Sequence, residues 1–371
     1  MATKVLGPSG LRSLIDLLHA GGYTVIGPTV ADGTIVYGSI ASIDDLPIGW
    51  TDTQEAGSYG IERREDDSFF AYNVGPRSLR HYLFPPRQTL LTIEHAETGL
   101  RFCQEPPDNI RYAFVGVRAC ELAAVAIQDA VFLDSPHADP NYARAREHSF
   151  TIGVNCAVAG GTCFCASMGK GPSCTAGYDL VVTEVIEESH HEFVVEAGTE
   201  DGADLLGRVE GRQATDQDAG VVDAIVKETA RNMGRAMPTH GLRDLMVEGF
   251  DSPTWDSVAQ RCLSCTSCTL VCPTCFCSTM SDTTDLVGTA RRERTWDSCF
   301  SLEFTYLHGH SVRSSTGARY RQWITHKLGW WHDQFGISGC VGCGRCITWC
   351  PVGIDITEEV AKLAGRAEAI A

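Results

Sequence analysis

Two cysteine runs of the same spacing lie in the last third of the chain. Each reads C-x2-C-x2-C-x3-C-P; the first spans residues 262–273 and the second spans residues 340–351. In bacterial-type ferredoxins this spacing gives three thiolates to one [4Fe–4S] cluster and the fourth thiolate to the other. The predicted ligands are Cys262, Cys265, Cys268 and Cys350 for the first cluster, and Cys272, Cys340, Cys343 and Cys346 for the second. A structural zinc site, which closes with four ligands from paired knuckles, is the alternative.

Four more cysteines lie upstream among several glycines. They are Cys156, Cys163, Cys165 and Cys174. Glycine lets the backbone approach an inorganic core closely, and dense thiols in a reducing compartment favour metal binding. We predict that these four residues bind a third [4Fe–4S] cluster, in addition to the two of the C-terminal runs. The alternative is one zinc ion with additional structural thiols.

A seven-residue segment occurs twice with almost the same letters. Residues 162–168 read Thr-Cys-Phe-Cys-Ala-Ser-Met, and residues 274–280 read Thr-Cys-Phe-Cys-Ser-Thr-Met. Two interpretations are open: each copy seats the edge of its own cluster, or both copies face one shared cluster. Cys275 and Cys277 of the second copy, with Cys299 nearby in Trp-Asp-Ser-Cys-Phe, are candidate cofactor-binding residues. The alternative is that these three thiols only line the surroundings of a cluster.

Cys120 is a further candidate because of its local context. A buried strand is predicted over 111–117, followed by a helix that opens near Cys120 and runs to about Phe132. A thiol at a helix N-terminus has a lowered pKa and sits where anions are favoured. The residue is therefore a candidate contact to a cluster or cofactor. The alternative is a small buried side chain at a tight turn.

The elements that must position these cysteines predict an α+β fold. A helix over 11–18 is followed by hairpins over 23–40 and 178–197, and strands at 111–117 and 150–154 flank the helix at Cys120 in a parallel βαβ unit. Residues 1–250 are expected to form a mixed α/β domain that holds the third site. Residues 251–371 are expected to form a mostly helical, two-[4Fe–4S] ferredoxin-like domain. Its insertion is long, because Cys272 and Cys340 are 68 positions apart (340 − 272).

The composition excludes several classes of function. The net charge of −17 over 371 residues argues against binding nucleic acid, whose phosphates would be repelled. No signal peptide is indicated, and no apolar run approaches the length of a membrane span. The protein is therefore expected in the cytoplasm. One basic segment, 313–327, is expected to offset cluster charge, to dock an acidic partner, or only to form a solvated face.

Several segments together resemble one known family. They are Cys-Pro-Thr-Cys-Phe-Cys at 272–277, Trp-Asp-Ser-Cys-Phe at 296–300, Arg-Tyr-Arg-Gln-Trp at 319–323, His-Lys at 326–327, and the second cysteine run continued to 356. The combination is similar to the beta, iron–sulfur subunit of cytoplasmic nickel–iron hydrogenases of the sulfhydrogenase type. It is also similar to the related A subunit of anaerobic sulfite reductase. The segments 78–86, 116–124 and 156–172 fit as well, so the resemblance covers most of the chain.

The resemblance implies an electron-transfer subunit that performs no bond chemistry itself. Its implied partners are a flavin-containing, NAD(P)H-binding diaphorase subunit and nickel–iron hydrogenase subunits. The ligands of the two C-terminal runs carry over residue by residue, and the 156–174 set carries over less fully. The sequence shows no nickel-binding Cys pairs, no G-x-G-x-x-G after a strand and no Walker loop. The catalytic metal would then lie on another chain, which in the alternative belongs to a sulfite reductase.

Two other classes of function remain open from the residues. In the first, the chain is an enzyme in which Cys120 or Cys299 acts as a reactive thiol beside a cluster and reduces a sulfur compound. In the second, the chain is a redox sensor or scaffold that binds a target without passing electrons to it.

Overall fold

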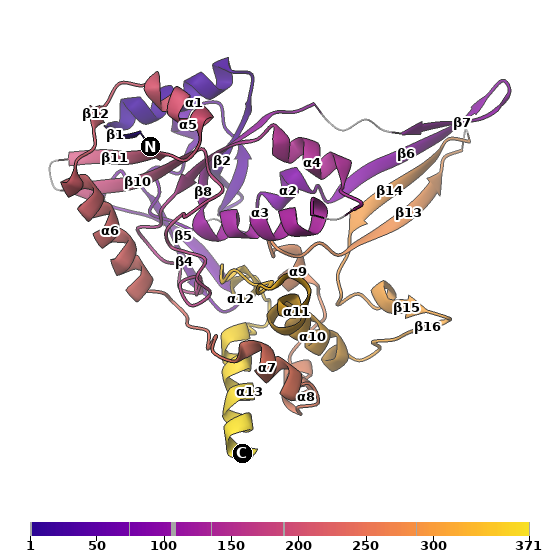
Figure 1. Ribbon diagram of the computed structural model, residues 1–371. Helices are drawn as coiled ribbons and strands as arrows, with labels where there is room; N and C mark the ends of the chain where they lie inside the picture. The colour runs from indigo at the N-terminus through magenta and orange to yellow at the C-terminus, as the bar shows by residue number, and fades with distance from the viewer. Residues whose placement is uncertain are drawn as a thin grey trace.

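The computed structural model describes residues 2–73, 75–104, 109–134, 136–187, 190–286 and 288–370. Its largest feature is an eight-stranded sheet built from the first 213 residues. Figure 1 shows this sheet above a group of short helices that carries the C-terminal cysteine runs. The C-terminal helix extends furthest from the sheet. Among the described residues, no helix is long and apolar enough to cross a membrane.

The strands of the large sheet are ordered β12-β1-β11-β10-β9-β8-β2-β3. Their bounds are β1 (Thr3–Leu6), β2 (Thr24–Ala31), β3 (Thr34–Ser39), β8 (Tyr112–Arg118), β9 (Phe150–Val154), β10 (Leu180–Glu187), β11 (His190–Ala197) and β12 (Arg212–Gln213). The central strands β10, β9, β8 and β2 are parallel, and the flanking pairs are antiparallel. The predicted parallel strand–helix–strand unit is therefore confirmed.

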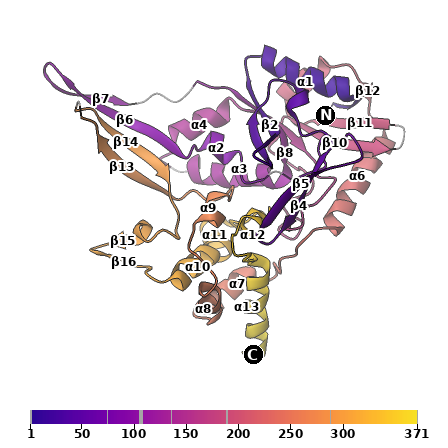
Figure 2. The ribbon, with the colours of Figure 1, turned by 180° about the vertical axis from the view of Figure 1, so that it is seen from behind.

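Helices cover the sheet. The bounds are α1 (Pro8–Ala20), α3 (Ala119–Phe132), α4 (Pro140–Glu147), α5 (Glu200–Gly207) and α6 (Asp216–Arg231). The helix expected over 11–18 is confirmed as α1: its four predicted apolar side chains are all buried. In Figures 1 and 2, α1 and α5 lie together above the sheet, whereas α3 lies between the sheet and the cysteine-rich helices.

Short helices pack around a second apolar core. Their bounds are α7 (Leu242–Glu248), α8 (Thr254–Ala259), α9 (Ser267–Leu270), α10 (Thr316–Thr325), α11 (Trp331–Phe335), α12 (Arg345–Thr348) and α13 (Ile356–Ile370), with a π-helical turn, η3 (His326–Trp330), between α10 and α11. Trp255, Trp323 and Val360 are buried in this core. Phe164 also belongs to it, so the upstream Thr-Cys-Phe-Cys segment is packed into the C-terminal half.

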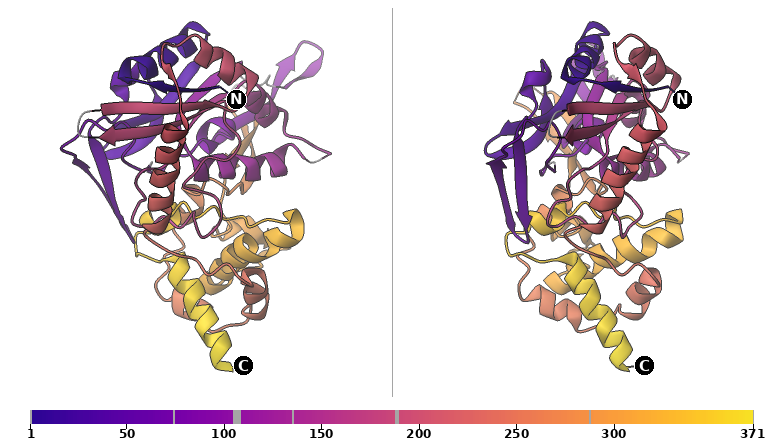
Figure 3. Two further views of the ribbon diagram at one scale, coloured as in Figure 1. Left: turned by 60° about the vertical axis from the view of Figure 1, so that its left-hand side comes forward. Right: turned by 90° about the vertical axis from the view of Figure 1, so that its left-hand side faces the viewer.

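A second sheet joins the two halves of the chain. Its order is β13-β14-β6-β7, with bounds β6 (Arg87–Ala96), β7 (Gly99–Gln104), β13 (Ser278–Thr284) and β14 (Ala290–Trp296). Figures 1 and 2 show the two hairpins projecting from the molecule, and in the left view of Figure 3 the tip of the β6–β7 hairpin extends at the upper right. The insertion between the two cysteine runs therefore begins with strands and becomes helical only from residue 316. The expected domain boundary near residue 250 lies between β6 and β14 in the sequence. Since these two strands pair with each other, backbone hydrogen bonds connect the parts on either side of that boundary.

The remaining elements are short. They are η1 (Ile43–Asp45), β4 (Trp50–Glu55), β5 (Ser58–Arg63), α2 (Arg80–Leu83), η2 (Glu303–Thr305), β15 (Tyr306–Leu307) and β16 (His310–Ser311). The β4–β5 hairpin reaches down to the second cysteine run (Figure 1). At its turn the backbone N–H of Gly57 donates to the carbonyl of Ile347 at 3.1 Å. The predicted hairpin over 178–197 is formed by β10 and β11, but Ser189 at its turn lies outside the described residues.

Replacing Gly57 by alanine should loosen the contact between this hairpin and the second run. A Cβ at Gly57 would lie 2.8 Å from the carbonyl oxygen of Cys350, and that backbone would have to shift. Gly33→Ala is the matched control, since Gly33 also has positive φ (68° against 77°) but nothing within 4 Å of its Cβ. Both variants carry the left-handed strain of about 1–2 kcal/mol. We expect Gly57→Ala to lower the anaerobic melting temperature by several degrees more than Gly33→Ala; equal shifts would contradict the contact.

Candidate metal centres

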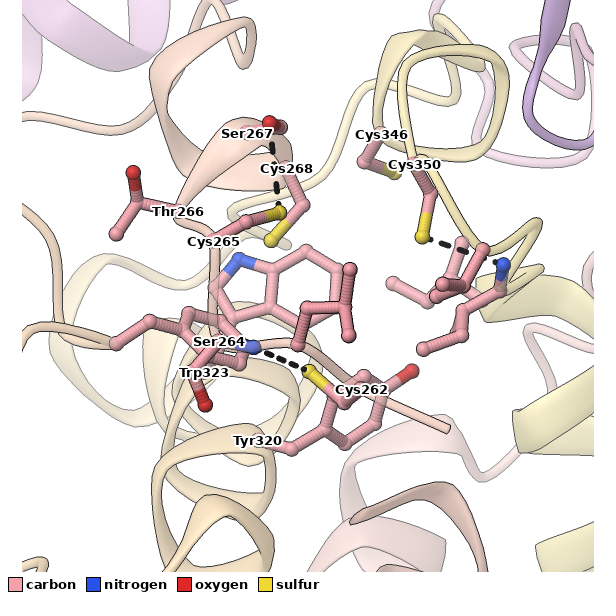
Figure 4. A pocket seen from close by; sticks show the side chains of 15 residues that line it. Cys262, Ser264, Cys265, Thr266, Ser267, Cys268, Tyr320, Trp323, Cys346 and Cys350 are labelled. Carbon is pink, nitrogen blue, oxygen red and sulfur yellow. Dashed lines mark hydrogen bonds between the residues drawn. The ribbon is translucent and has the colours of Figure 1, made fainter. Parts of the chain in front are cut away.

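The first predicted ligand set is brought together in one cavity. Cys262, Cys265, Cys268 and Cys350 all line it, although they come from segments more than eighty positions apart. Figure 4 shows Cys265 and Cys268 on one side and Cys350 on the other, with the Trp323 ring below the space between them and the Tyr320 ring near Cys262. The space not filled by atoms is about 460 Å³.

Backbone N–H groups point at the sulfurs of this cavity. The N–H of Ser264 lies 3.4 Å from the Cys262 sulfur, and the N–H of Ile354 lies 3.3 Å from the Cys350 sulfur (Figure 4). Such donors stabilise thiolates because they favour the charged form. The arrangement therefore fits thiolate ligands of an anionic group.

The two cysteine runs have the same unusual backbone. In the first run Ser264 and Thr266 have φ of 52° and 69°, and in the second run Gly342 and Gly344, at the same positions, have φ of 71° and 74°. Left-handed residues at these points turn the chain so that successive cysteines face one space. Glycine is required in the second run for another reason as well: a Cβ at Gly344 would lie 2.4 Å from the carbonyl oxygen of Thr162.

The second predicted set is also gathered, and it is more deeply buried. Cys272 and Cys340 are buried, and Cys272, Cys343 and Cys340 all lie close enough to act electrostatically on Cys346. Burial raises the pKa of Cys340 to about 12. The Cys340 thiol is therefore protonated at neutral pH, and a bound metal would supply the charge that deprotonates it.

A buried lysine serves this second set. Lys327, 6% exposed, donates to Thr274 Oγ1 at 2.7 Å and lies 3.4 Å from the Cys272 sulfur. Burial opposes its charge, yet the neighbouring sulfurs of Cys272, Cys275 and Cys340 raise the pKa of Lys327 well above its ordinary value. The basic segment 313–327 was expected to offset cluster charge, and Lys327 is placed to do so.

The third predicted set is divided. Cys156, Cys163 and Cys165 line one cavity, but Cys174 does not line it, and Cys120 does. Cys174 is packed in the N-terminal apolar core. The two Thr-Cys-Phe-Cys segments line different cavities, which corresponds to the interpretation with separate sites rather than one shared cluster.

Cys275, Cys277 and Cys299 line a fourth and more open cavity. It contains about 1000 Å³ of space not filled by atoms, and Arg313, His326 and Lys327 also line it. Cys277 and Cys299 are in side-chain contact, which lowers the pKa of Cys277 to about 7. Cys103 lies on β7, away from all of these cavities.

Buried arginines near the cysteines have no recognisable pattern in the sequence. Arg345, inside the second run, forms a buried ion pair with Glu121 of α3. Arg80 of α2 donates to the carbonyl oxygens of Thr269 and Cys275 and stacks on Trp296 at 3.4 Å. In the sequence, Arg345 could have been noticed because it lies inside the second cysteine run, and Arg80 because it lies in the segment 78–86 that resembles the family. Both tie the cysteine runs to the N-terminal half.

The residues present fit [4Fe–4S] clusters. Five thiols line the first cavity, namely the four of the first set and Cys346 of the second, with N–H groups directed at two of the sulfurs. In the part of the chain that the structure describes, no three Cys, His, Asp or Glu side chains are gathered tightly enough to hold a single metal ion. The thiols line shared cavities instead, as ligands of a multi-iron cluster would.

Comparison with known proteins defines the class of this C-terminal part. Residues 261–354 match the 4Fe–4S dicluster domain family, so the chain carries a domain for at least two [4Fe–4S] clusters. Over 350 residues the chain is 27% identical to sulfhydrogenase 2 subunit beta of Pyrococcus furiosus, a match that covers 91% of this chain and 92% of that protein. The resemblance found in the sequence is thereby confirmed. No solved structure matches the chain.

Replacing Lys327 by methionine should make the second cluster harder to reduce. A buried positive charge beside Cys272 favours the more negative, reduced form, and its loss removes on the order of 1–3 kcal/mol of that preference. We expect one midpoint potential to fall by on the order of 50–150 mV in an anaerobic redox titration followed by electron paramagnetic resonance. Lys227→Met is the control, since Lys227 is exposed and pairs with Asp223. Unchanged potentials with full iron content would rule out this role.

Proposed function

We propose that this chain is the electron-transfer subunit of an oxidoreductase complex. It relays electrons between a flavin subunit that binds NAD(P)H and a nickel–iron hydrogenase module. Clusters of the [4Fe–4S] type supply one-electron uptake and release when bound. The observation that carries the proposal is that two complete four-cysteine sets are gathered side by side in one folded domain.

The two sets share a wall, which suits a relay. Cys346 of the second set lines the cavity of the first, and Cys268 of the first acts electrostatically on Cys346. Aromatic and aliphatic side chains, including Tyr320, Trp323 and Ile356, complete that wall. Such packing keeps water out and holds the ligands rigid, so that little has to reorganise when charge moves.

The first set also reaches the surface. Cys265 is exposed, and the apolar side chains of Leu263 and Val352 beside it are 64% and 39% exposed. Exposed apolar residues around a functional group commonly mark a contact with another protein. We place the docking site of one partner subunit over this edge.

Anaerobic purification of the tagged chain from its native cells tests the partners. We expect a flavin-containing subunit and a nickel-containing subunit to co-purify, with at least about eight irons on this chain, the content of two cubanes. Metal analysis and visible spectroscopy measure this outcome. Sirohaem absorption without nickel would instead indicate that the partner is a sulfite reductase rather than a hydrogenase. Fewer than eight irons would contradict the relay itself.

One observation favours a second function, the reduction of a sulfur compound at reactive thiols. Cys277 and Cys299 are in contact within the open cavity that Arg313 and Lys327 also line. Two adjacent thiols release two electrons and two protons when they form a disulfide, and the cations would attract an anionic sulfur species. Cys120, the other thiol considered for this role, lies in a different cavity.

Replacing Cys299 by alanine discriminates between the two functions. In the sulfur-reducing function, sulfide release from polysulfide with a reduced dye should fall about tenfold or more, because the nucleophile pair is lost. The iron content should stay at the parent value. Cys103→Ala is the control, since Cys103 lies on β7. Unchanged sulfide release from Cys299→Ala would leave electron transfer as the function.

A further inference from the structure

The cavity that contains Cys120 has the features of an additional metal centre. It lies between the N-terminus of α3, the loop after β9 and the second cysteine run. Five cysteines line it: Cys343 of the second run, together with Cys120, Cys156, Cys163 and Cys165, which belong to neither C-terminal run.

Two of these cysteines are placed by adjacent parallel strands. In the register of β8 and β9, Arg118 is paired with Val154, and these residues end their strands. Cys120 and Cys156 each come two residues later (120 − 118 and 156 − 154). Since the carboxyl ends of parallel strands meet at one edge of a sheet, both residues follow that edge, and both line the cavity.

The other two cysteines come from the upstream Thr-Cys-Phe-Cys segment. The backbone N–H of Phe164 donates to the carbonyl of Gly342 at 2.8 Å, and the Phe164 ring is fully buried in the second core. Cys163 and Cys165, on either side of Phe164, both line the cavity. The second run therefore holds this segment in place by direct backbone contact.

A buried arginine supplies a positive charge to this cavity. Arg118 is 3% exposed, and its guanidinium donates to the carbonyl oxygens of Phe70 and Tyr72 and lies 4.0 Å from the Cys156 sulfur. The carboxylate of Asp52 acts on it electrostatically, but the Nε of Arg118 has no hydrogen-bond partner among the described residues. A buried cation of this kind needs an anion beside it. A cluster held by four thiolates would provide that negative charge.

Cys174 has a different environment. Its sulfur lies 3.9 Å from the carbonyl oxygen of Val117, on the inner side of β8, and its backbone N–H donates to the Asn155 side chain at 2.8 Å. Its side chain is packed in the apolar core, although Cys156 and Arg118 lie near enough to act on it electrostatically. Because Cys174 does not line the cavity that the other four cysteines share, we assign it a structural role in the core.

We infer that Cys120, Cys156, Cys163 and Cys165 bind a third [4Fe–4S] cluster, with Cys120 in the place that the sequence pattern gave to Cys174. Cys343 of the second run also lines this cavity, so the third centre would adjoin the second. The inference extends the proposed relay, but its metal content can be tested independently of that function.

Iron analysis of two alanine variants tests the ligand set. In anaerobically purified protein, we expect Cys120→Ala to lose up to about four irons per chain relative to the parent, the content of one cubane. Electron paramagnetic resonance of the reduced protein should lose or alter one cluster signal. Cys174→Ala, which keeps a small apolar side chain in the core, should retain the parent iron content and all signals.

Two outcomes would overturn the inference. One is a Cys120→Ala protein with the iron content and spectrum of the parent. The other is loss of a cluster from Cys174→Ala with a circular dichroism spectrum like that of the parent, which would restore Cys174 as a ligand. Failure of the relay, by contrast, would be seen as absent partner subunits with the iron content unchanged.

Discussion

The close backbone contact between the second cysteine run and the upstream Thr-Cys-Phe-Cys segment is the constraint on which the rest depends. The run passes so near residues 162–165 that Gly342 and Gly344 leave no room for a side chain. On its other side, the carbonyl of Gly339 accepts hydrogen bonds from Thr274 and Lys327. The run is thus held between the two copies of the repeated segment, and cysteines from both halves of the chain meet around it.

The second constraint is the placement of buried positive charge near the cysteines. The chain is strongly acidic as a whole, yet the side chains buried beside the cysteines include Arg80, Arg118, Lys327 and Arg345. Burying a cation is unfavourable unless an anion or several acceptors surround it. Arg345 has Glu121, and Arg80 has main-chain carbonyls. Lys327 and Arg118 each lie against a cysteine sulfur, that of Cys272 and that of Cys156 respectively. The distribution of positive charge therefore follows the distribution of thiols rather than the surface.

Local patterns predicted much of the fold. The apolar spacing of Leu11, Leu14 and Leu18 defined a helix, and the buried strands on either side of α3 defined a parallel unit, because both signals depend on near neighbours. The sequence did not predict that β6 pairs with β14 across 197 to 208 positions (290 − 93 and 295 − 87). Polar strands such as Ser278–Thr284 carry little periodic signal, since most of their side chains are exposed.

The same distinction applies to the sites. The two C-terminal sets could be assigned because the ligands follow a fixed spacing, and the structure gathers them as expected. The upstream set has no such spacing, and nearness in sequence favoured Cys174 over Cys120. Parallel strand ends, which only the three-dimensional sheet defines, bring Cys120 and Cys156 to the same edge of the sheet, where both line one cavity.

Each predicted ligand set takes one cysteine from the other run, and this exchange has a consequence for biosynthesis. Cys350 completes the set that begins at Cys262, and Cys272 belongs to the set that is otherwise formed by the second run. Neither cubane can be fully enclosed until the ribosome has released nearly the whole polypeptide. The maturation machinery that delivers iron and sulfide would therefore act on a chain whose synthesis is nearly finished.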